Sequence, residues 1–73
     1  MGDLSTATVD VRDMLCAQAL AVVAQAAAQL LHDGWLDVTY SAEDVRRDLL
    51  AWAHDRAWIV REPSGGILRL QRP

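Results

Sequence analysis

Residues 41–72 constrain the fold of this chain more than any other segment, because an amphipathic helix there runs directly into a β-hairpin. Val45, Leu49 and Trp52 recur at the three- and four-residue spacing that places side chains on one face of a helix. Two short segments of alternating apolar and polar residues follow, with two glycines between them. This order predicts an α+β fold in which the helix packs its apolar face on an antiparallel hairpin.

The two hairpin segments, 58–62 and 67–71, have one register that keeps their apolar residues together on one face. A three-residue turn at residues 64–66, with Gly66 in the left-handed backbone region, produces this register. The pairs that it aligns are Val60 with Leu70 and Arg61 with Arg69. A turn of two or four residues mixes the two faces, so we expect the three-residue turn.

Residues 10–32 predict a long first helix, because they are rich in alanine, which has the highest helix propensity. Thr8 or Asp10 is a candidate N-terminal cap of this helix, and Gly34 follows it as a stop signal.

Residues 35–40 alternate β-branched or aromatic side chains with others, a pattern typical of a short strand. Ser41 follows as a candidate N-terminal cap of the second helix. Residues 1–8 are expected to form a flexible tail and residues 9–73 a single domain. The expected architecture is therefore a long N-terminal helix, a short strand, a second helix and a C-terminal β-hairpin.

The first helix is apolar around almost its whole circumference, apart from a stripe of glutamines. One interpretation is that it is simply the core helix of a small domain. The other is that its alanine side packs against a second copy of the chain, because a helix that is apolar all round needs burial from several sides. The residues expected in this homodimer interface are Ala17, Ala21, Ala24, Ala28 and Leu31.

The chain has 73 residues and a single cysteine, Cys16, which excludes a disulfide within the monomer. A metal site is not expected, because Cys16, His32 and His54 lack the spacing of zinc ligands. A chain this small often gains stability from a partner, and its hydrophobic content of 52% favours oligomerisation. No cofactor is expected.

The N-terminus is polar and acidic, unlike the positively charged start of a signal peptide. The apolar run at residues 14–31 is interrupted by three glutamines and makes a poor membrane span. We therefore expect a cytoplasmic protein without a membrane partner.

Charge is divided unevenly between the two halves of the chain. Residues 1–44 carry a net charge of −6 and residues 45–73 one of +3, which together give the −3 of the whole chain. The acidic balance argues against a non-specific nucleic-acid binder. All seven basic residues are arginine, however, and six lie in the C-terminal half, where they suit phosphates and guanine edges.

The expected hairpin register sets Arg61 against Arg69, and directly opposed like charges destabilise a sheet. One interpretation is that both arginines are solvated, or pair with Glu62 and Asp55. The other is that an anion such as a phosphate binds between them.

The run DVRRDLLAWAHDRAWIVREPSGGILRLQR, residues 44–72, resembles the recognition helix and wing of winged helix-turn-helix proteins. The resemblance implies a winged-helix-like domain over residues 10–72, with the second helix in the major groove of DNA. Only one helix fits between Tyr40 and Trp58, so the family's positioning helix is missing or reduced to a turn. The residues that the resemblance places on double-stranded DNA are Arg46, Arg47, His54, Arg61, Ser64, Gly65 and Arg69.

We therefore expect a small non-enzymatic transcriptional regulator that binds double-stranded DNA through the second helix and the hairpin wing. The alternative is a protein–protein interaction module, such as an adaptor or inhibitor of a larger complex, with no nucleic-acid binding. Catalysis and a small-molecule substrate are not expected, because the sequence contains neither a nucleophile–base arrangement nor a phosphate-binding loop. Cys16 lies on the apolar side of its helix and is expected to be inert.

Overall fold

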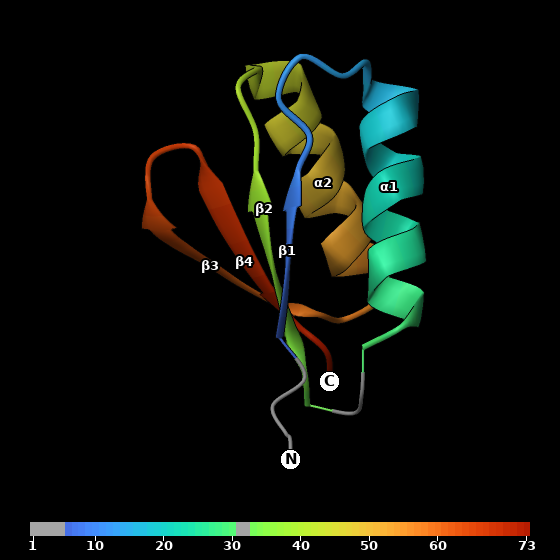
Figure 1. The fold of residues 1–73 in the computed structure, drawn as a ribbon. Coiled ribbons are helices and arrows are strands. Elements are labelled where there is room, and N and C mark those ends of the chain that lie inside the picture. Colours follow the sequence, from blue (N-terminus) through green and yellow to red (C-terminus); the bar gives the residue numbers. More distant parts are fainter. Residues whose placement is uncertain (1–5, 31–32) are drawn as a thin grey trace.

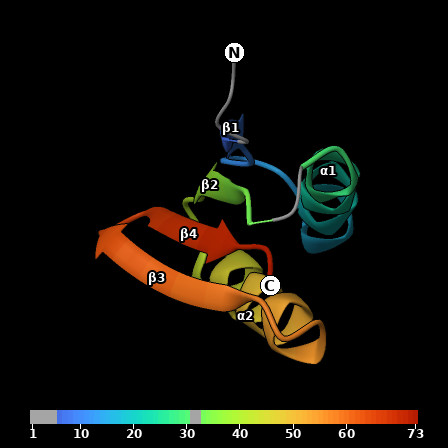
Figure 2. The same ribbon diagram turned by 90° about the horizontal axis from the view of Figure 1, so that it is seen from below.

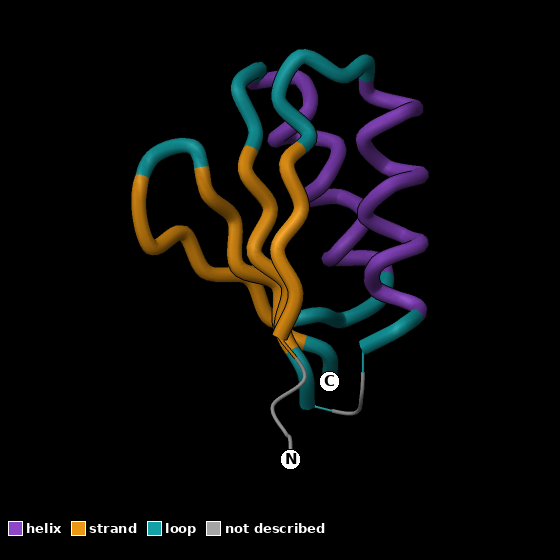
Figure 3. The backbone as a smooth tube through the Cα atoms, in the orientation of Figure 1, coloured by secondary structure: helices purple, strands orange, loops and turns teal. Residues whose placement is uncertain are grey.

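The computed structural model describes residues 6–30 and 33–73, and it shows two helices packed on one face of a four-stranded sheet (Figures 1 and 3). The elements in chain order are β1 (Thr6–Asp10), α1 (Cys16–Ala28), β2 (Trp35–Thr39), α2 (Glu43–Asp55), β3 (Ile59–Ser64) and β4 (Ile67–Gln71). Seen along the strands, both helices lie on the same side of the sheet (Figure 2). No other described element covers the opposite face.

The sheet combines parallel and antiparallel neighbours in the order β1–β2–β4–β3. β1 and β2 are parallel, with Thr6 beside Trp35 and Asp10 beside Thr39. Parallel neighbours need a crossover connection, and α1 provides it. β4 is antiparallel to β2 on one side and to β3 on the other. The last strand in the chain is therefore an inner strand of the sheet.

The core lies between the sheet and the helices, where alternate strand residues meet one face of each helix. Two of the three buried residues of α1 are alanines, which allows this helix to approach the sheet closely. The buried core cluster consists of Val11, Ala19, Val23, Leu30, Leu36, Val38, Val45, Leu49, Ala53, Leu68 and Leu70. This packing fixes which face of α2 is available to solvent.

The expected strand, helix and hairpin of the second half are confirmed by β2, α2 and the β3–β4 pair. Helix α2 buries Val45 and Leu49, as its periodicity predicted. The predicted cap of this helix was wrong, because Ala42 is the N-cap and makes no side-chain capping hydrogen bond. The hydroxyl of Ser41 instead accepts a hydrogen bond from the backbone N–H of Asp13, at 3.4 Å.

The predicted first half was wrong in two respects, because the helix is short and a strand precedes it. Strand β1 occupies residues 6–10, so residues 6–8 are not a tail; residues 1–5 lie outside the described residues. Threonine and valine favour strands, and Ala7 and Val9 pack against the core from this strand. Pairing with β2 therefore overrides any capping role of Thr8 or Asp10.

Helix α1 begins only at Cys16 because the preceding loop has its own structure. The carboxylate of Asp10 accepts hydrogen bonds from the backbone N–H of Arg12 at 3.0 Å and from its guanidinium at 2.7 Å. Asp13 has a φ of 67°, a left-handed conformation that no α-helix contains. High alanine content thus identified a helix without locating its start.

The hairpin pairs Val60 with Leu70 and Arg61 with Arg69, which confirms the predicted register along most of its length. Its turn was predicted one residue too long. Ser64 pairs with Ile67, so the turn is Gly65–Gly66, and an irregularity between Arg61 and Ser64 absorbs the extra residue. Pro63 lies in this irregular segment and has no N–H to donate to a regular ladder. Gly66 has a φ of 86°, the left-handed conformation expected of it.

Candidate binding surface on the open face of the sheet

The open face of the sheet presents its side chains in rows, because paired residues of neighbouring strands lie side by side. One row, from β1 to β3, is Thr6, Trp35, Gln71 and Ile59. The next row is Thr8, Asp37, Arg69 and Arg61. An aromatic and an aliphatic residue thus lie beside a row that contains two arginines and one carboxylate.

A hollow of about 250 Å³ lies where these two rows meet on β2, β3 and β4. Its lining consists of Trp35, Ile59, Arg61, Arg69 and Gln71. Ile59 is 47% exposed and lies beside Trp35 in the lining, so it presents apolar surface to solvent on this face. The hollow therefore offers both apolar surface and positive charge to a molecule on this face.

Asp37 compensates the charge of only one arginine in the hollow. The guanidinium of Arg69 donates from Nε to Asp37 Oδ1 at 2.8 Å and from Nη2 to Oδ2 at 3.1 Å. This pair raises the pKa of Arg69, and the guanidinium lies 5.8 Å from the centre of the Trp35 ring. Within residues 6–30 and 33–73, no carboxylate forms an ion pair with Arg61.

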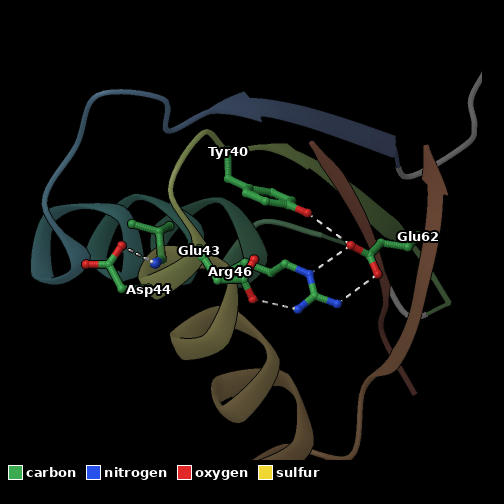
Figure 4. Close-up of polar contacts among 6 residues, drawn as sticks. Tyr40, Glu43, Asp44, Arg46 and Glu62 are labelled. Atoms are coloured by element: carbon green, nitrogen blue, oxygen red, sulfur yellow. Dashed lines mark hydrogen bonds and ion pairs between the residues drawn. The ribbon is translucent and has the colours of Figure 1, made fainter. Parts of the chain in front are cut away.

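Arg46 joins α2 to the hairpin and is not free on the helix surface (Figure 4). Its Nε and Nη2 donate to the two carboxylate oxygens of Glu62, at 2.9 and 3.0 Å, and its Nη1 donates to Glu43 at 3.0 Å. The hydroxyl of Tyr40 donates to the same Glu62 at 3.0 Å. The bonds from Arg46 and Tyr40 hold the pKa of Glu62 at about 2.

The other residues expected on DNA are not brought together with the hollow. Arg47 and His54 are exposed on α2, in the layer opposite the open face, and Ser64 and Gly65 are exposed at the hairpin tip. Arg47 and His54 share the solvent-exposed part of α2 with four acidic residues: Glu43, Asp44, Asp48 and Asp55. The expected DNA-contacting residues therefore divide between two faces, and the α2 face is predominantly acidic.

The alanines expected in a homodimer interface are on the solvent side of α1. Ala17, Ala21, Ala24 and Ala28 are exposed, and Leu31 lies outside the described residues. Leu15, just before the helix, is 77% exposed. The structure thus leaves this strip available to a partner, and homodimer formation stays a prediction.

A second hollow, of about 430 Å³, lies between the C-terminal ends of the two helices. Trp52 and Trp58 line it with their ring centres 5.4 Å apart, and Arg56 lies 4.6 Å above the Trp52 ring. Arg72 donates to the backbone carbonyl of Ala27 at 2.8 Å, and Arg56 donates to that of Trp52 at 3.4 Å. These arginines stabilise the carbonyl ends of the helices, which carry partial negative charge.

Cys16 is the first residue of α1 and is half-buried beside α2. Burial, followed by the carboxylates of Asp48 and Asp44, raises the pKa of its thiol. A helix N-terminus acts in the opposite direction, since it favours a thiolate. Because the raised pKa keeps the group a thiol at neutral pH, it is a weak nucleophile in this structure.

Sequence reasoning named both arginines of the open-face hollow as binding residues but assigned no site role to Asp37, Ile59 or Gln71. Alternation along β2, β3 and β4 is the signal that places these residues on the open face, because residues next to buried ones point to the opposite face. Asp37 lies between the buried Leu36 and Val38.

Neither helix is both long and apolar enough to cross a membrane, as far as the described residues extend. The same residues contain no group of three His, Cys, Asp or Glu side chains arranged to hold a metal ion. In comparisons with protein-family models, curated proteins and solved structures, none matches this chain.

Proposed function

We propose that this protein is a non-enzymatic binding module that acts through protein–protein contacts on the open face of its sheet. One observation carries the proposal: Arg46 and Arg69 each form a two-pronged ion pair with a carboxylate of the same chain. An arginine in such a pair must lose it before it binds a phosphate. Arg46 and Arg69, two of the residues expected to contact DNA, are therefore not free to bind a phosphate.

Charge on the rest of the surface supports the same proposal. The exposed side of α2 carries four acids beside Arg47, and the whole chain has a net charge of −3. Non-specific affinity for DNA depends on several arginine or lysine contacts to phosphates. A protein partner needs no such array, because apolar contact and a few polar groups suffice.

A DNA-binding regulator is the second candidate function, and it is favoured by the exposed Arg47, Arg61 and hairpin tip. The order of α2, β3 and β4 is the feature that resembles a winged-helix protein. In that proposal α2 approaches the major groove through Arg47 and His54, and the β3–β4 turn contacts the adjacent backbone. The winged-helix assignment and the transcriptional role remain predictions.

A fluorescence-anisotropy titration with a labelled mixed-sequence duplex separates the two candidates. We measure binding at about 50 mM and about 200 mM salt, and we expect no duplex affinity of the kind that falls steeply as the salt concentration rises. Micromolar binding with a steep salt dependence, abolished by Arg47→Glu, contradicts the protein-contact proposal and supports the DNA-binding regulator.

A photo-crosslinking amino acid at position 59 tests the open face directly. Cross-linking to a protein partner is expected from position 59 and not from position 51, which is exposed on α2. An excess of the wild-type protein without the cross-linking residue should reduce this cross-linking by competing for the partner, and an excess of the Arg61→Glu variant should not. Equal cross-linking from both positions contradicts a role for the sheet face.

A further inference from the structure

We propose that the open-face hollow binds a carboxylate side chain of an acidic segment in a partner protein, with an apolar neighbour of that carboxylate on Trp35 and Ile59. This inference rests on the proposed function and names the chemistry of the partner. The carboxylate pairs with Arg61, beside the ion pair that Arg69 keeps with Asp37, and the apolar side chain covers the adjacent row. The hollow thereby selects an acidic residue that has an aliphatic or aromatic neighbour.

The charges of the second row leave one positive charge without a partner. Asp37, Arg69 and Arg61 lie side by side on β2, β4 and β3, and Asp37 binds only Arg69. Arg61 is exposed and lies directly opposite Arg69, so two like charges are neighbours across the strands. A carboxylate from a partner supplies the missing negative charge, and a guanidinium binds a carboxylate through paired hydrogen bonds.

The row beside these arginines provides an apolar contact. Ile59 is 47% exposed, and Trp35 is half-buried with its ring under the Arg69 guanidinium. A partner side chain that covers Ile59 and Trp35 removes apolar surface from water. It also shields the ion pair from solvent, which strengthens the charge interaction.

The hollow has room for side chains of a partner protein. Its volume is about 250 Å³, enough for one or two amino-acid side chains. The apolar area of Trp35 and Ile59 then contributes together with the arginines.

Electrostatics also favour a single carboxylate over a nucleic acid. One arginine without an ion pair among residues 6–30 and 33–73 matches one carboxylate, whereas a strand of nucleic acid brings a phosphate at every nucleotide. The acids of the same face, Asp37 and Asp10, are paired with Arg69 and Arg12, and the chain as a whole has a net charge of −3. This face therefore has few free positive charges for further phosphates.

The test uses a fluorescein-labelled, otherwise neutral peptide that contains one glutamate next to a leucine, and the same peptide with glutamine in place of the glutamate as its uncharged match. The glutamate peptide is expected to bind in fluorescence anisotropy. Binding of the glutamine peptide is expected to be at least about tenfold weaker, because hydrogen bonds to charged groups are the stronger ones.

Arg61→Gln removes the uncompensated charge and is expected to weaken binding of the glutamate peptide by about tenfold. Ile59→Thr is expected to weaken it as well, by removing apolar contact. Arg56→Gln is the matched control, since Arg56 is an exposed arginine in the opposite layer, and it is expected to leave binding unchanged. Thermal unfolding of each variant establishes that it is folded.

Three results overturn the inference: equal binding of the two peptides, unchanged affinity in folded Arg61→Gln, or displacement of the peptide by a lower concentration of single-stranded oligonucleotide. The last result assigns the hollow to nucleic acid. These results differ from the one that contradicts the proposed function, which is salt-dependent binding of duplex DNA that is lost in Arg47→Glu.

Discussion

Leu49→Ala tests the orientation of α2, on which the assignment of its exposed and buried faces depends. Leu49 is fully buried and belongs to the same core cluster as Leu68 and Leu70 of the inner strand β4. Its neighbour Leu50 is only half-buried. The two leucines therefore form a matched pair in which the same chemical change meets two different environments.

The expected loss is large relative to the total stability of the domain. Replacing a fully buried leucine by alanine reduces the free energy of unfolding by about 3 to 5 kcal/mol, through lost transfer energy and a residual cavity. A domain of this length has a total stability of about 4 to 11 kcal/mol. A loss of about 3 kcal/mol lowers the midpoint of thermal unfolding by about 12 to 24 °C.

Urea unfolding followed by far-ultraviolet circular dichroism measures both variants on the same scale. Leu50→Ala is expected to reduce the free energy of unfolding by only about 1 kcal/mol, a typical value for a partly exposed site. The reasoning is refuted if Leu49→Ala lowers the free energy of unfolding by no more than Leu50→Ala does. That result means that α2 is rotated, and the outward placement of Arg47 and His54 fails with it.

Three further outcomes follow from single residues. The pKa of Glu62 is about 2 in the folded protein, against an ordinary value of 4.5. Its stabilising effect is therefore complete above pH 4.5 and is lost as the pH falls toward 2, so the midpoint of urea unfolding should fall over this range. An equally steep fall in Glu62→Gln contradicts the assignment. The raised pKa of the Cys16 thiol predicts slow alkylation by iodoacetamide at neutral pH, measured by mass spectrometry. Alkylation should be faster in Asp48→Asn, and an unchanged rate means that the Asp48 carboxylate does not raise this pKa. Gly66→Ala should lower the free energy of unfolding by about 1 kcal/mol, because φ is positive at this residue. Gly65→Ala should leave it nearly unchanged, because the space around this residue is open. Equal losses in the two variants disprove the turn geometry.

Local patterns in the sequence predicted the second half of the fold well. The spacing of Val45 and Leu49 identified the buried face of α2, and the alternation around two glycines identified the hairpin. Both signals arise between residues close in the chain, where periodicity and turn chemistry act directly. The Arg61–Arg69 pair followed from the same local register and led to the hollow on the open face.

Contacts between distant residues were not predictable in the same way. Strand β1 is stable because it pairs with β2, and nothing within residues 6–10 identifies that neighbour. The ion pairs of Arg46 with Glu62 and of Arg69 with Asp37 span 16 and 32 residues. Such partners become evident only when the sheet order is known, so the sequence indicated where arginines lie but not which of them are already paired.

The inner position of β4 makes this strand the link between the two sides of the sheet. Among the described strands, β3 pairs with β4 alone, and β2 reaches β3 through β4. Displacement of residues 67–71 leaves β3 without its strand partner and opens an edge of β2 to pairing with other chains. The hollow is lined from both sides of this link, so it exists only while β4 stays in the sheet.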